Sequence, residues 1–409
     1  MRILHTSDWH LGQYFITKSR AAEHQAFISW LLCQVSEQEI DALIIAGDLF
    51  DTGAPPSYAR ELYNRFVVDL NRLGCQLVVL AGNHDSVATL GESRELLACL
   101  NTQVIPKVSD DPGSQLLVLK DARGEPGAIL CAVPYIRPRD VMKSRAGESG
   151  DEKQQALGEA IAEHYQRLYQ LAQELRESYD ASLPIIATGH LTAMGVSCSE
   201  SVRDIYVGTL EAFPASLFPA FDYIALGHIH RPQRVGKTEH IRYSGSPIPL
   251  SFDELGSQKQ LLVVEFTGGK LSSVEPLNIP CFQPMQVIRG SLAKIEHQLE
   301  ALDDSAELAL WLSIEVQGQE YLHDLQQRIS AMIHGRNLEI LQLRRARERS
   351  GLALQQTKEV LTELKPHEVF EKRLALESFE TEDELRRRER LCHTFSQILN
   401  QLESREERA

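Results

Sequence analysis

The chain has 409 residues, of which 43% are hydrophobic and 24% are charged, and this composition predicts a globular protein of two or three domains. Its apolar runs fall short of the roughly 18 residues of a membrane span, and the polar start MRILHTSDWH is unlike a signal peptide, so we expect a cytoplasmic protein. The seven cysteines have no Cys-x-x-Cys spacing, which argues against a disulfide framework and a thiolate metal site.

The formal net charge is −15, from 42 Lys and Arg against 57 Asp and Glu. This balance disfavours unassisted, non-specific binding to nucleic acid, because such binding depends on many Lys and Arg contacts to phosphate. A protein this acidic that handles phosphate groups needs metal ions, local basic patches or a partner.

Through residue 280, short apolar runs alternate with amphipathic stretches, the pattern of an α/β or α+β sandwich built around a central sheet. The expected strands are residues 2–4, 42–46, 77–81, 128–133, 184–188 and 223–227. Apolar residues at helical spacing predict helices around residues 27–35, 58–70 and 157–175. Ser57 is the expected N-cap of the second helix.

The pattern changes after Pro280 to a β-α-β-α-β order, which predicts a smaller second domain. We therefore expect a first domain over 1–280, a second over 281–350 and a helical hairpin over 351–409. The hairpin carries an apolar stripe formed by Leu391, Phe395, Ile398 and Leu402. This stripe either docks on another chain or folds back on its own domain, and the sequence leaves both open.

Polar side chains follow nearly every expected strand of the first domain. In chain order they are Asp8, His10, Asp48, Asp51, Asn83, His84, Asp85, His190, His228 and His230. Taken singly, an Asp or Asn after a strand is more often a turn former or helix cap, and a single His is more often structural. Five such clusters would need five coincidences, whereas the carboxyl ends of strands commonly gather one ligand site. Imidazole, carboxylate and amide groups suit Mn, Fe, Zn or Mg.

The order of these motifs resembles that of the calcineurin-like metallophosphoesterases: Asp-x-His, Gly-Asp-x-x-Asp, Gly-Asn-His-Asp, Gly-His and Gly-His-x-His. The resemblance implies a two-sheet metallophosphoesterase sandwich flanked by helices, with two divalent metal ions. It implies that one metal is bound by Asp8, His10, Asp48 and His230. It also implies that Asp48 bridges to a second metal, which is bound by Asn83, His190 and His228.

The remaining motif residues have other implied roles. His84 matches the family's catalytic histidine, which contacts the substrate phosphate and not a metal. Asp51 matches the carboxylate that orients this histidine in many members. Asp85 matches no role, and a cap or a partner of a ligand is expected. The loop from Ser244 to Pro247 is expected either to donate to the phosphate or to form an ordinary turn.

The stretches around the motifs, such as ILHTSDWHLG, AGDLFDTGAPPSYA and YSGSPIPLSF, are similar to the SbcD family of nuclease subunits in bacterial DNA-repair complexes. The similarity extends over nearly the whole chain and implies that residues 281–350 are a capping domain. It implies a Mn-dependent 3′–5′ exonuclease on double-stranded DNA and an endonuclease on single-stranded and hairpin DNA, active in repair, replication and recombination. It further implies an SbcC ATPase partner bound by the C-terminal helices, and a homodimer within a heterotetramer.

Two other readings remain open from the residues alone. The chain could be a phosphodiesterase or phosphatase of the same superfamily that acts on a small nucleotide, with the C-terminal unit as a lid. It could also be a metal-free scaffold, although that reading predicts missing ligands and none is missing here.

Overall fold

The computed structural model describes residues 1–142, 150–202, 212–303, 308–317, 322–345 and 395. The hairpin expected over 351–409 lies outside these residues, except for Phe395. A search of the described helices finds none with the length and apolar character needed to cross a membrane.

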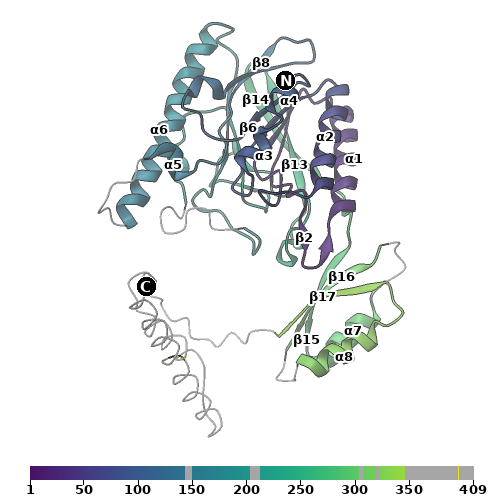
Figure 1. Cartoon of the computed structure of the whole chain (residues 1–409). Coiled ribbons are helices and arrows are strands. Elements are labelled where there is room, and N and C mark those ends of the chain that lie inside the picture. Colours follow the sequence, from purple (N-terminus) through teal and green to yellow (C-terminus); the bar gives the residue numbers. More distant parts are fainter. Residues whose placement is uncertain (143–149, 203–211, 304–307, 318–321, 346–394, 396–409) are drawn as a thin grey trace, which may run out of the picture. The chain divides into compact units, whose positions relative to one another are not determined.

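Two six-stranded sheets form the centre of the molecule (Figure 1). The first sheet contains, in order across it, β14 (Lys270–Asn278), β13 (Gln260–Thr267), β1 (Arg2–Thr6), β4 (Ala42–Ala46), β5 (Gln76–Leu80) and β6 (Thr102–Ile105). The second contains β11 (Gln233–Arg234), β12 (Ile241–Tyr243), β10 (Tyr223–Gly227), β9 (Ile185–His190), β8 (Pro126–Cys131) and β7 (Leu116–Lys120). In the first sheet β1, β4, β5 and β6 are parallel, and the antiparallel strands β13 and β14 lie at one edge. In the second sheet β8, β9, β10 and β12 are parallel, and antiparallel β7 and β11 lie at the two edges.

The side-chain alternation of β4 shows how the layers are held together. Ala42, Ile44 and Ala46 point into a core shared by the two sheets. Leu43 and Ile45 point the other way, into a core shared with helices. All five residues are buried, because both faces of this parallel strand are covered. The continuous apolar run seen in the sequence therefore belongs to a strand at the centre of a four-layer sandwich.

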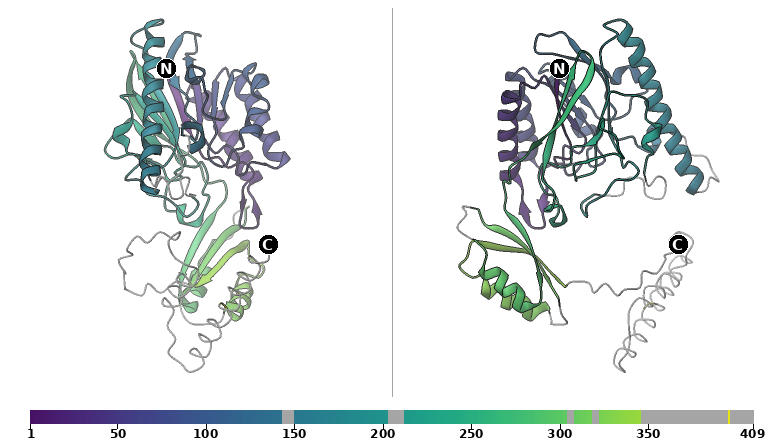
Figure 2. Two further views of the ribbon diagram at one scale, coloured as in Figure 1. Left: turned by 60° about the vertical axis from the view of Figure 1, so that its left-hand side comes forward. Right: turned by 180° about the vertical axis from the view of Figure 1, so that it is seen from behind.

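Helices cover the outer face of each sheet, as Figures 1 and 2 show. Helices α1 (Ala21–Glu37) and α2 (Ser57–Arg72) pack on the first sheet, and α6 (Gly150–Glu177) packs on the second. The expected helix-flanked, two-sheet metallophosphoesterase sandwich is therefore confirmed. The shorter helices are α3 (Val87–Gly91), α4 (Arg94–Ala98) and α5 (Pro138–Val141), together with 3₁₀ helices η1 (Pro112–Gln115), η2 (Ala215–Leu217) and η3 (Phe252–Glu254).

The expected N-cap of α2 is wrong. Ser57 is the first residue inside the helix, and Pro56 occupies the cap position without a side-chain hydrogen bond. Proline fixes its own φ near −65°, so Pro56 directs the chain into the helix by backbone restriction rather than by an accepting oxygen.

A separate three-stranded parallel sheet follows residue 280. Its elements are β15 (Met285–Gly290), α7 (Leu292–Glu300), β16 (Leu310–Val316), α8 (Leu322–Met332) and β17 (Leu338–Arg345), with β16 in the middle. They enclose a core of their own, which includes Ile288, Ile295 and Ile314. The order is the expected β-α-β-α-β, while the domain boundaries at 280 and 350 stay predictions, since Met1–Ala346 clusters as one compact unit.

A small hairpin follows the first motif of the chain. Its strands, β2 (Tyr14–Phe15) and β3 (Lys18–Ser19), place Phe15 5.0 Å from the ring of Phe252 and 6.0 Å from that of Trp311. Because Phe252 begins η3, this aromatic cluster fixes the start of a segment whose last residue, Glu254, lies behind the metal-ligand cluster described below.

Candidate metal centre

The polar residues predicted from the sequence gather where the carboxyl ends of the two sheets meet. Loops after β1, β4 and β5 supply side chains from the first sheet, and β9 and the loop after β10 supply them from the second. Among the described residues, three groups have ligand atoms that all lie within 4.8 Å of one another. Two consist of predicted ligands, Asp8 with His10 and His230, and Asp48 with His190 and His228, and the third joins His10 and Asp48 to His84.

Asp48 lies between the two groups. One of its carboxylate oxygens is 3.7 Å from Nε2 of His10 and 3.2 Å from Nε2 of His190. Asn83 belongs to the second group, since its side-chain oxygen is 3.0 Å from Nε2 of His190 and 3.2 Å from Nδ1 of His228. The seven predicted ligands thus lie close together, with Asp48 between the two groups, and their division into two metal sites stays a prediction.

The hydrogen bonds of the imidazoles fit metal binding. In three of the four predicted histidine ligands, Nδ1 has a partner outside the group: the Asp51 carboxylate for His10, the Ala46 carbonyl for His190 and the Ser201 hydroxyl for His230. The Nε2 atoms of His10 and His228 are buried and have no hydrogen-bond partner. A buried nitrogen without a partner is costly in a folded protein, and coordination of a divalent cation would satisfy it.

The charges of Asp48 and His190 favour a positive charge between these two residues. Burial opposes the protonated form of His190, but Asp48 outweighs it and raises the pKa of His190 to about 9. Burial likewise opposes the ionised form of Asp48, but His190 and His10 hold the pKa of Asp48 well below its usual range. A divalent cation between these groups would take the place of the imidazole protons.

The backbone at the ligands has an unusual conformation. Asp8, His10, Asp48 and His228 have φ values of 55°, 48°, 49° and 92°, in the left-handed region that residues with a Cβ rarely adopt. Each such residue costs of order 1–3 kcal/mol and persists only where its surroundings hold it. The surroundings here are hydrogen bonds between the loops, from Asp8 N to Gly47 O at 3.0 Å and from His10 N to Asp48 O at 3.1 Å.

The glycines that precede the predicted ligands are required because neighbouring loops approach closely at these positions. A Cβ on Gly47 would lie 2.1 Å from Nδ1 of His190, and one on Gly82 would lie 2.1 Å from a carboxylate oxygen of Asp48. A Cβ on Gly227 would lie 1.9 Å from the carbonyl oxygen of Ala46. The Gly-Asp, Gly-Asn and Gly-His pairs in the sequence therefore have a steric cause, because the loops touch where a side chain would begin.

His84 has a ring nitrogen within 4.8 Å of ligand atoms of His10 and Asp48, and its side chain is partly exposed. Its main-chain N–H donates to Asp48 at 2.8 Å, and its Nδ1 lies 2.7 Å from the main-chain oxygen of Asp51. Asp51 thus orients His84 through its backbone carbonyl, while its carboxylate contacts His10 at 3.1 Å.

Asp85, which matched no role in the sequence, ties two loops together. Its carboxylate accepts hydrogen bonds from the main-chain N–H groups of Gly82 at 2.9 Å, Leu49 at 3.1 Å and Phe50 at 3.0 Å. Burial and the nearby charge of Asp48 raise the pKa of Asp85 to about 6. Asp85 therefore joins the Asp48 loop to the Asn83 loop.

The loop from Ser244 to Pro247 supports the ligands from behind. The Ser244 hydroxyl lies 3.0 Å from that of Ser7, which donates to Asp8 at 2.6 Å. Both Ser244 and Ser246 have no exposed area. Their hydroxyls are therefore engaged inside the protein, which does not favour the expected donation to phosphate.

A buried ion pair that the sequence did not reveal lies behind His230. Glu254 and Lys259 are 2.5 Å apart, and Lys259 also donates to the main-chain oxygen of His230 at 2.9 Å. Burial would raise the pKa of Glu254, but Lys259 and His230 hold it well below its usual range. In the sequence these residues stand in a polar stretch, SFDELGSQK, that is typical of a surface turn.

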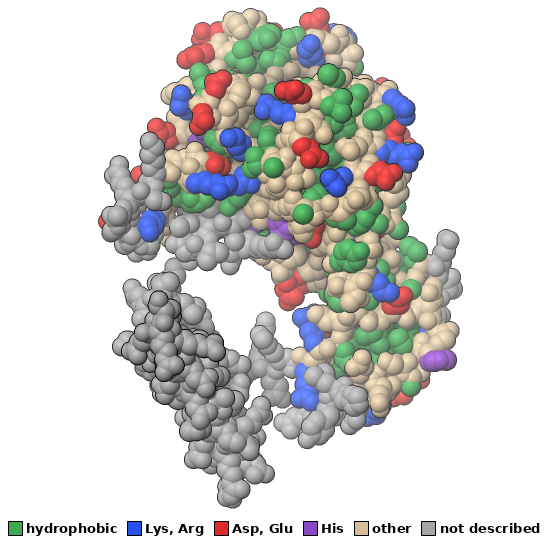
Figure 3. Space-filling model, in the orientation of Figure 1, with side chains coloured by type: hydrophobic (Ala, Val, Ile, Leu, Met, Phe, Trp, Pro, Cys, Tyr) green, Lys and Arg blue, Asp and Glu red, His purple; other side chains and the backbone are tan. Residues whose placement is uncertain are grey.

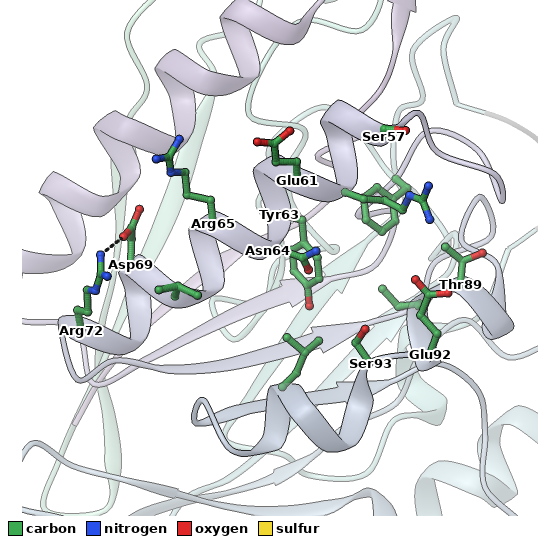
Figure 4. Close-up of a pocket in the computed structure, with 15 residues that line it drawn as sticks. Ser57, Glu61, Tyr63, Asn64, Arg65, Asp69, Arg72, Thr89, Glu92 and Ser93 are labelled. Atoms are coloured by element: carbon green, nitrogen blue, oxygen red, sulfur yellow. Dashed lines mark hydrogen bonds and ion pairs between the residues drawn. The ribbon is translucent and has the colours of Figure 1, made fainter.

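A pocket of about 730 Å³ lies between α2 and the segment of α3 and α4, drawn in Figure 4. Its described lining includes Arg65, Asp69 and Arg72, of which Arg72 pairs with Asp69, and contains none of the seven predicted ligands.

Known families and proteins match this chain along most of its length. The calcineurin-like phosphoesterase family matches residues 1–232, and the family described as the type 5 capsule protein repressor C-terminal domain matches residues 281–378. The SbcD component of the SbcCD nuclease from Escherichia coli (strain K12) is 56% identical over 404 residues, which cover 98% of each chain. The corresponding SbcD proteins from Rhodobacter capsulatus and Bacillus subtilis are 35% and 28% identical, covering 74% and 82% of this chain and 75% and 85% of theirs.

The first match covers the part of the chain that carries the sandwich and the predicted ligands. The second covers the three-stranded parallel sheet, and the identity to the Escherichia coli protein spans both. The chain therefore belongs to the SbcD family of nuclease subunits, within the calcineurin-like phosphoesterases.

Proposed function

We propose that this chain is a two-metal phosphodiesterase that acts as the nuclease subunit of an SbcC/SbcD complex. Its substrates are double-stranded DNA, cleaved as a 3′–5′ exonuclease, and single-stranded or hairpin DNA, cleaved as an endonuclease. The activity depends on Mn²⁺ and is stimulated by ATP hydrolysis in the SbcC ATPase, in repair, replication and recombination. The observation that carries this proposal is the convergence of the seven predicted ligand side chains around Asp48.

The proposed ligand sets are those that the family resemblance implies, and the closeness of the side chains supports them. One metal would be bound by Asp8, His10, Asp48 and His230, and the second by Asp48, Asn83, His190 and His228. Asp48 suits the shared position because a carboxylate has two oxygens, and Asn83 contributes an oxygen without further charge. When bound, such a pair of ions polarises the phosphate, lowers the pKa of a water molecule and stabilises the attacking and leaving oxygens of an in-line displacement.

His84 supplies the proton chemistry that the ligands cannot. Its Nδ1–H donates to the carbonyl of Asp51, which fixes the ring and leaves the proton of the charged form on Nε2. From there, His84 would stabilise negative charge on the phosphate or protonate the leaving oxygen. Asp51 has two effects in this scheme, because it orients His84 through its carbonyl and His10 through its carboxylate.

The surface charge is consistent with DNA binding that needs metal ions or a partner protein. On the face drawn in Figure 3, basic and acidic side chains of the described residues are interspersed. With a net charge of −15, metal ions and the SbcC partner would supply much of the attraction to the DNA backbone. We infer that residues 351–409 bind SbcC and that the chain forms a homodimer within a heterotetramer.

The experiment is a nuclease assay on linear and hairpin duplexes, with and without SbcC, ATP and Mn²⁺, after the chain has been treated with a chelator. We expect two Mn²⁺ ions per chain and DNA cleavage that returns with Mn²⁺. Hydrolysis of cyclic nucleotides with no cleavage of any DNA would replace the nuclease by the small-nucleotide alternative. Salt dependence further distinguishes a nuclease from a small-nucleotide enzyme. Cleavage of duplex DNA should become weaker between about 50 and 200 mM salt, whereas hydrolysis of a small molecule should not.

A further inference from the structure

His230 is held on its side away from the other ligands by a group that no motif of the sequence contains. Its ring is buried, and Nδ1 lies 2.6 Å from the hydroxyl of Ser201. The same hydroxyl donates to an oxygen of the Glu254 carboxylate, which itself lies 3.3 Å from Nδ1 of His230. Ser201 therefore lies between the imidazole and a buried carboxylate.

The direction of these hydrogen bonds follows from the charge of Glu254. The carboxylate has no exposed area and pairs with Lys259 at 2.5 Å, so it is an ionised acceptor. Ser201 has a single proton, and donating it to Glu254 leaves its oxygen to accept from Nδ1–H of His230. The tautomer of His230 is thereby fixed, and Nε2 keeps its lone pair on the side of Asp8 and His10.

The Glu254 carboxylate is itself held in place from several sides. Besides Ser201 and Lys259, it accepts from the Ser199 hydroxyl at 2.8 Å and from the main-chain N–H of Leu250 at 3.1 Å. Lys259 also donates to the main-chain oxygen of His230 at 2.9 Å. The ion pair thus contacts both the backbone and, through Ser201, the side chain of this ligand.

We propose that Glu254, acting through Ser201, is a positioning residue for the metal ligand His230. It fixes the tautomer and ring plane in which Nε2 meets the first metal, the one also bound by Asp8 and His10. This inference rests on the proposed function, because it needs His230 to bind a metal. Partners of this kind around histidine ligands typically change metal affinity by about 10–100-fold when they are removed.

Substitutions at two serines distinguish positioning of the His230 ring from support of the Glu254 carboxylate. Ser201 and Ser199 both donate to Glu254, but the contact with His230 is made by Ser201. Ser201→Ala should weaken one of the two Mn²⁺ sites several-fold and leave the other unchanged. Ser199→Ala, the matched control, should leave both sites as in the unmodified chain. Equal losses in the two variants would overturn the proposal, because support of the carboxylate alone would then explain the effect.

The double variant Glu254→Gln with Lys259→Met tests the ion pair as a whole without leaving a buried charge unpaired. A single Glu254→Gln change would strand Lys259, and the chain could then fail to fold for that reason alone. We expect the double variant to unfold near the normal temperature in the presence of a chelator, but to bind one Mn²⁺ about 10–100-fold more weakly. High Mn²⁺ concentrations should restore its DNA cleavage. Glu315→Gln is the control, since Glu315 pairs with Arg289 and Arg344 in the three-stranded sheet.

The measurement is equilibrium binding of Mn²⁺ to the full chain, obtained from the concentration of Mn²⁺ that remains free. The variant His230→Ala serves as the reference for loss of one site. Normal affinity at both sites in the Ser201 and double variants, with one site lost in the reference, would overturn the role of Glu254 and keep the proposed function. Binding of fewer than two ions by the unmodified chain would instead refute the proposed function, and this inference with it.

Discussion

Substitution of Gly82 by alanine tests whether the close approach of two loops creates the metal centre. The added Cβ would lie 2.1 Å from an Asp48 carboxylate oxygen and 2.3 Å from the Asp48 main-chain nitrogen. Contacts of a Cβ below 3.0 Å are essentially never seen, so a gap of roughly 1 Å must open between the loops. Gly82 does not have a left-handed φ, so alanine adds a steric effect and no backbone strain.

The gap would separate Asp48, which both ligand groups share, from Asn83 and His84. The hydrogen bond from His84 N to Asp48, 2.8 Å long, lies directly across it. Misplacement of catalytic groups by about 1 Å commonly costs about 10²-fold in rate. We therefore expect Gly82→Ala to lower Mn²⁺-dependent hydrolysis of DNA by about 10²-fold and to weaken binding at the site of Asn83.

The matched control is Gly256→Ala, because Gly256 also lacks a left-handed φ and has no atom within 4 Å of its added Cβ. Steady-state hydrolysis and Mn²⁺ binding should be measured for both variants. If Gly82→Ala kept full activity and both ions, the loops would have moved apart without consequence, and the steric explanation of the Gly-Asn pair would be wrong.

Three further outcomes follow from the site and from the tail. His84→Ala should retain two Mn²⁺ ions and lose about 10²–10³-fold in hydrolysis, because it removes a charge-stabilising group and no ligand; loss of one ion would make His84 a ligand. Asp85→Asn should lower the free energy of unfolding by about 1–3 kcal/mol, because one amide oxygen cannot accept from three main-chain N–H groups. A urea titration with chelator present measures this change, and unchanged stability would refute the role of Asp85 in joining the loops. Deletion of residues after about 365 should keep Mn²⁺ binding and abolish association with SbcC in a pull-down, and retained association would exclude docking through the tail.

The candidate ligands could be recognised in the sequence because each lies at or just after the end of a strand. Six buried strands appear as short apolar runs, and five of these runs end in polar residues that the structure brings together. The expected bounds differ from the structure by a few residues at most, as in β8, which covers Pro126–Cys131 and not residues 128–133. The family resemblance then divides the ligands into two sets, which periodicity alone does not.

One strand that the expected set lacks, β14, has a physical reason for its absence. It lies at the edge of the first sheet, and all of its residues are exposed or only partly buried. Its sequence, KLSSVEPLN, is therefore mostly polar and lacks the apolar run that marks a central strand.

The supporting residues could not be predicted because their partners are distant in sequence. Asp85 bonds to groups about 35 residues earlier, and Glu254 bonds to Ser201 across 53 residues. A polar residue in a short loop is usually exposed, and only the fold shows that Glu254 is buried against a metal ligand. Residues that bind a metal are visible as motifs, whereas residues that orient those ligands become visible once the loops have been brought together.

The origin of the ligand geometry lies in the main chain. Four ligands have a left-handed φ, and the loops that carry them are joined by hydrogen bonds such as that from His228 N to Asp8 at 2.9 Å. These bonds connect a loop of the first sheet to a loop of the second, so they form as the sandwich closes. The conformational cost of the ligands is therefore offset by packing of the two sheets rather than by coordination. In small metal-folded domains the reverse holds, because there the free energy of metal binding is the free energy of folding. In this chain, a compact sandwich with extensive apolar cores positions the ligands, and a divalent cation would bind to a site that the fold has already formed.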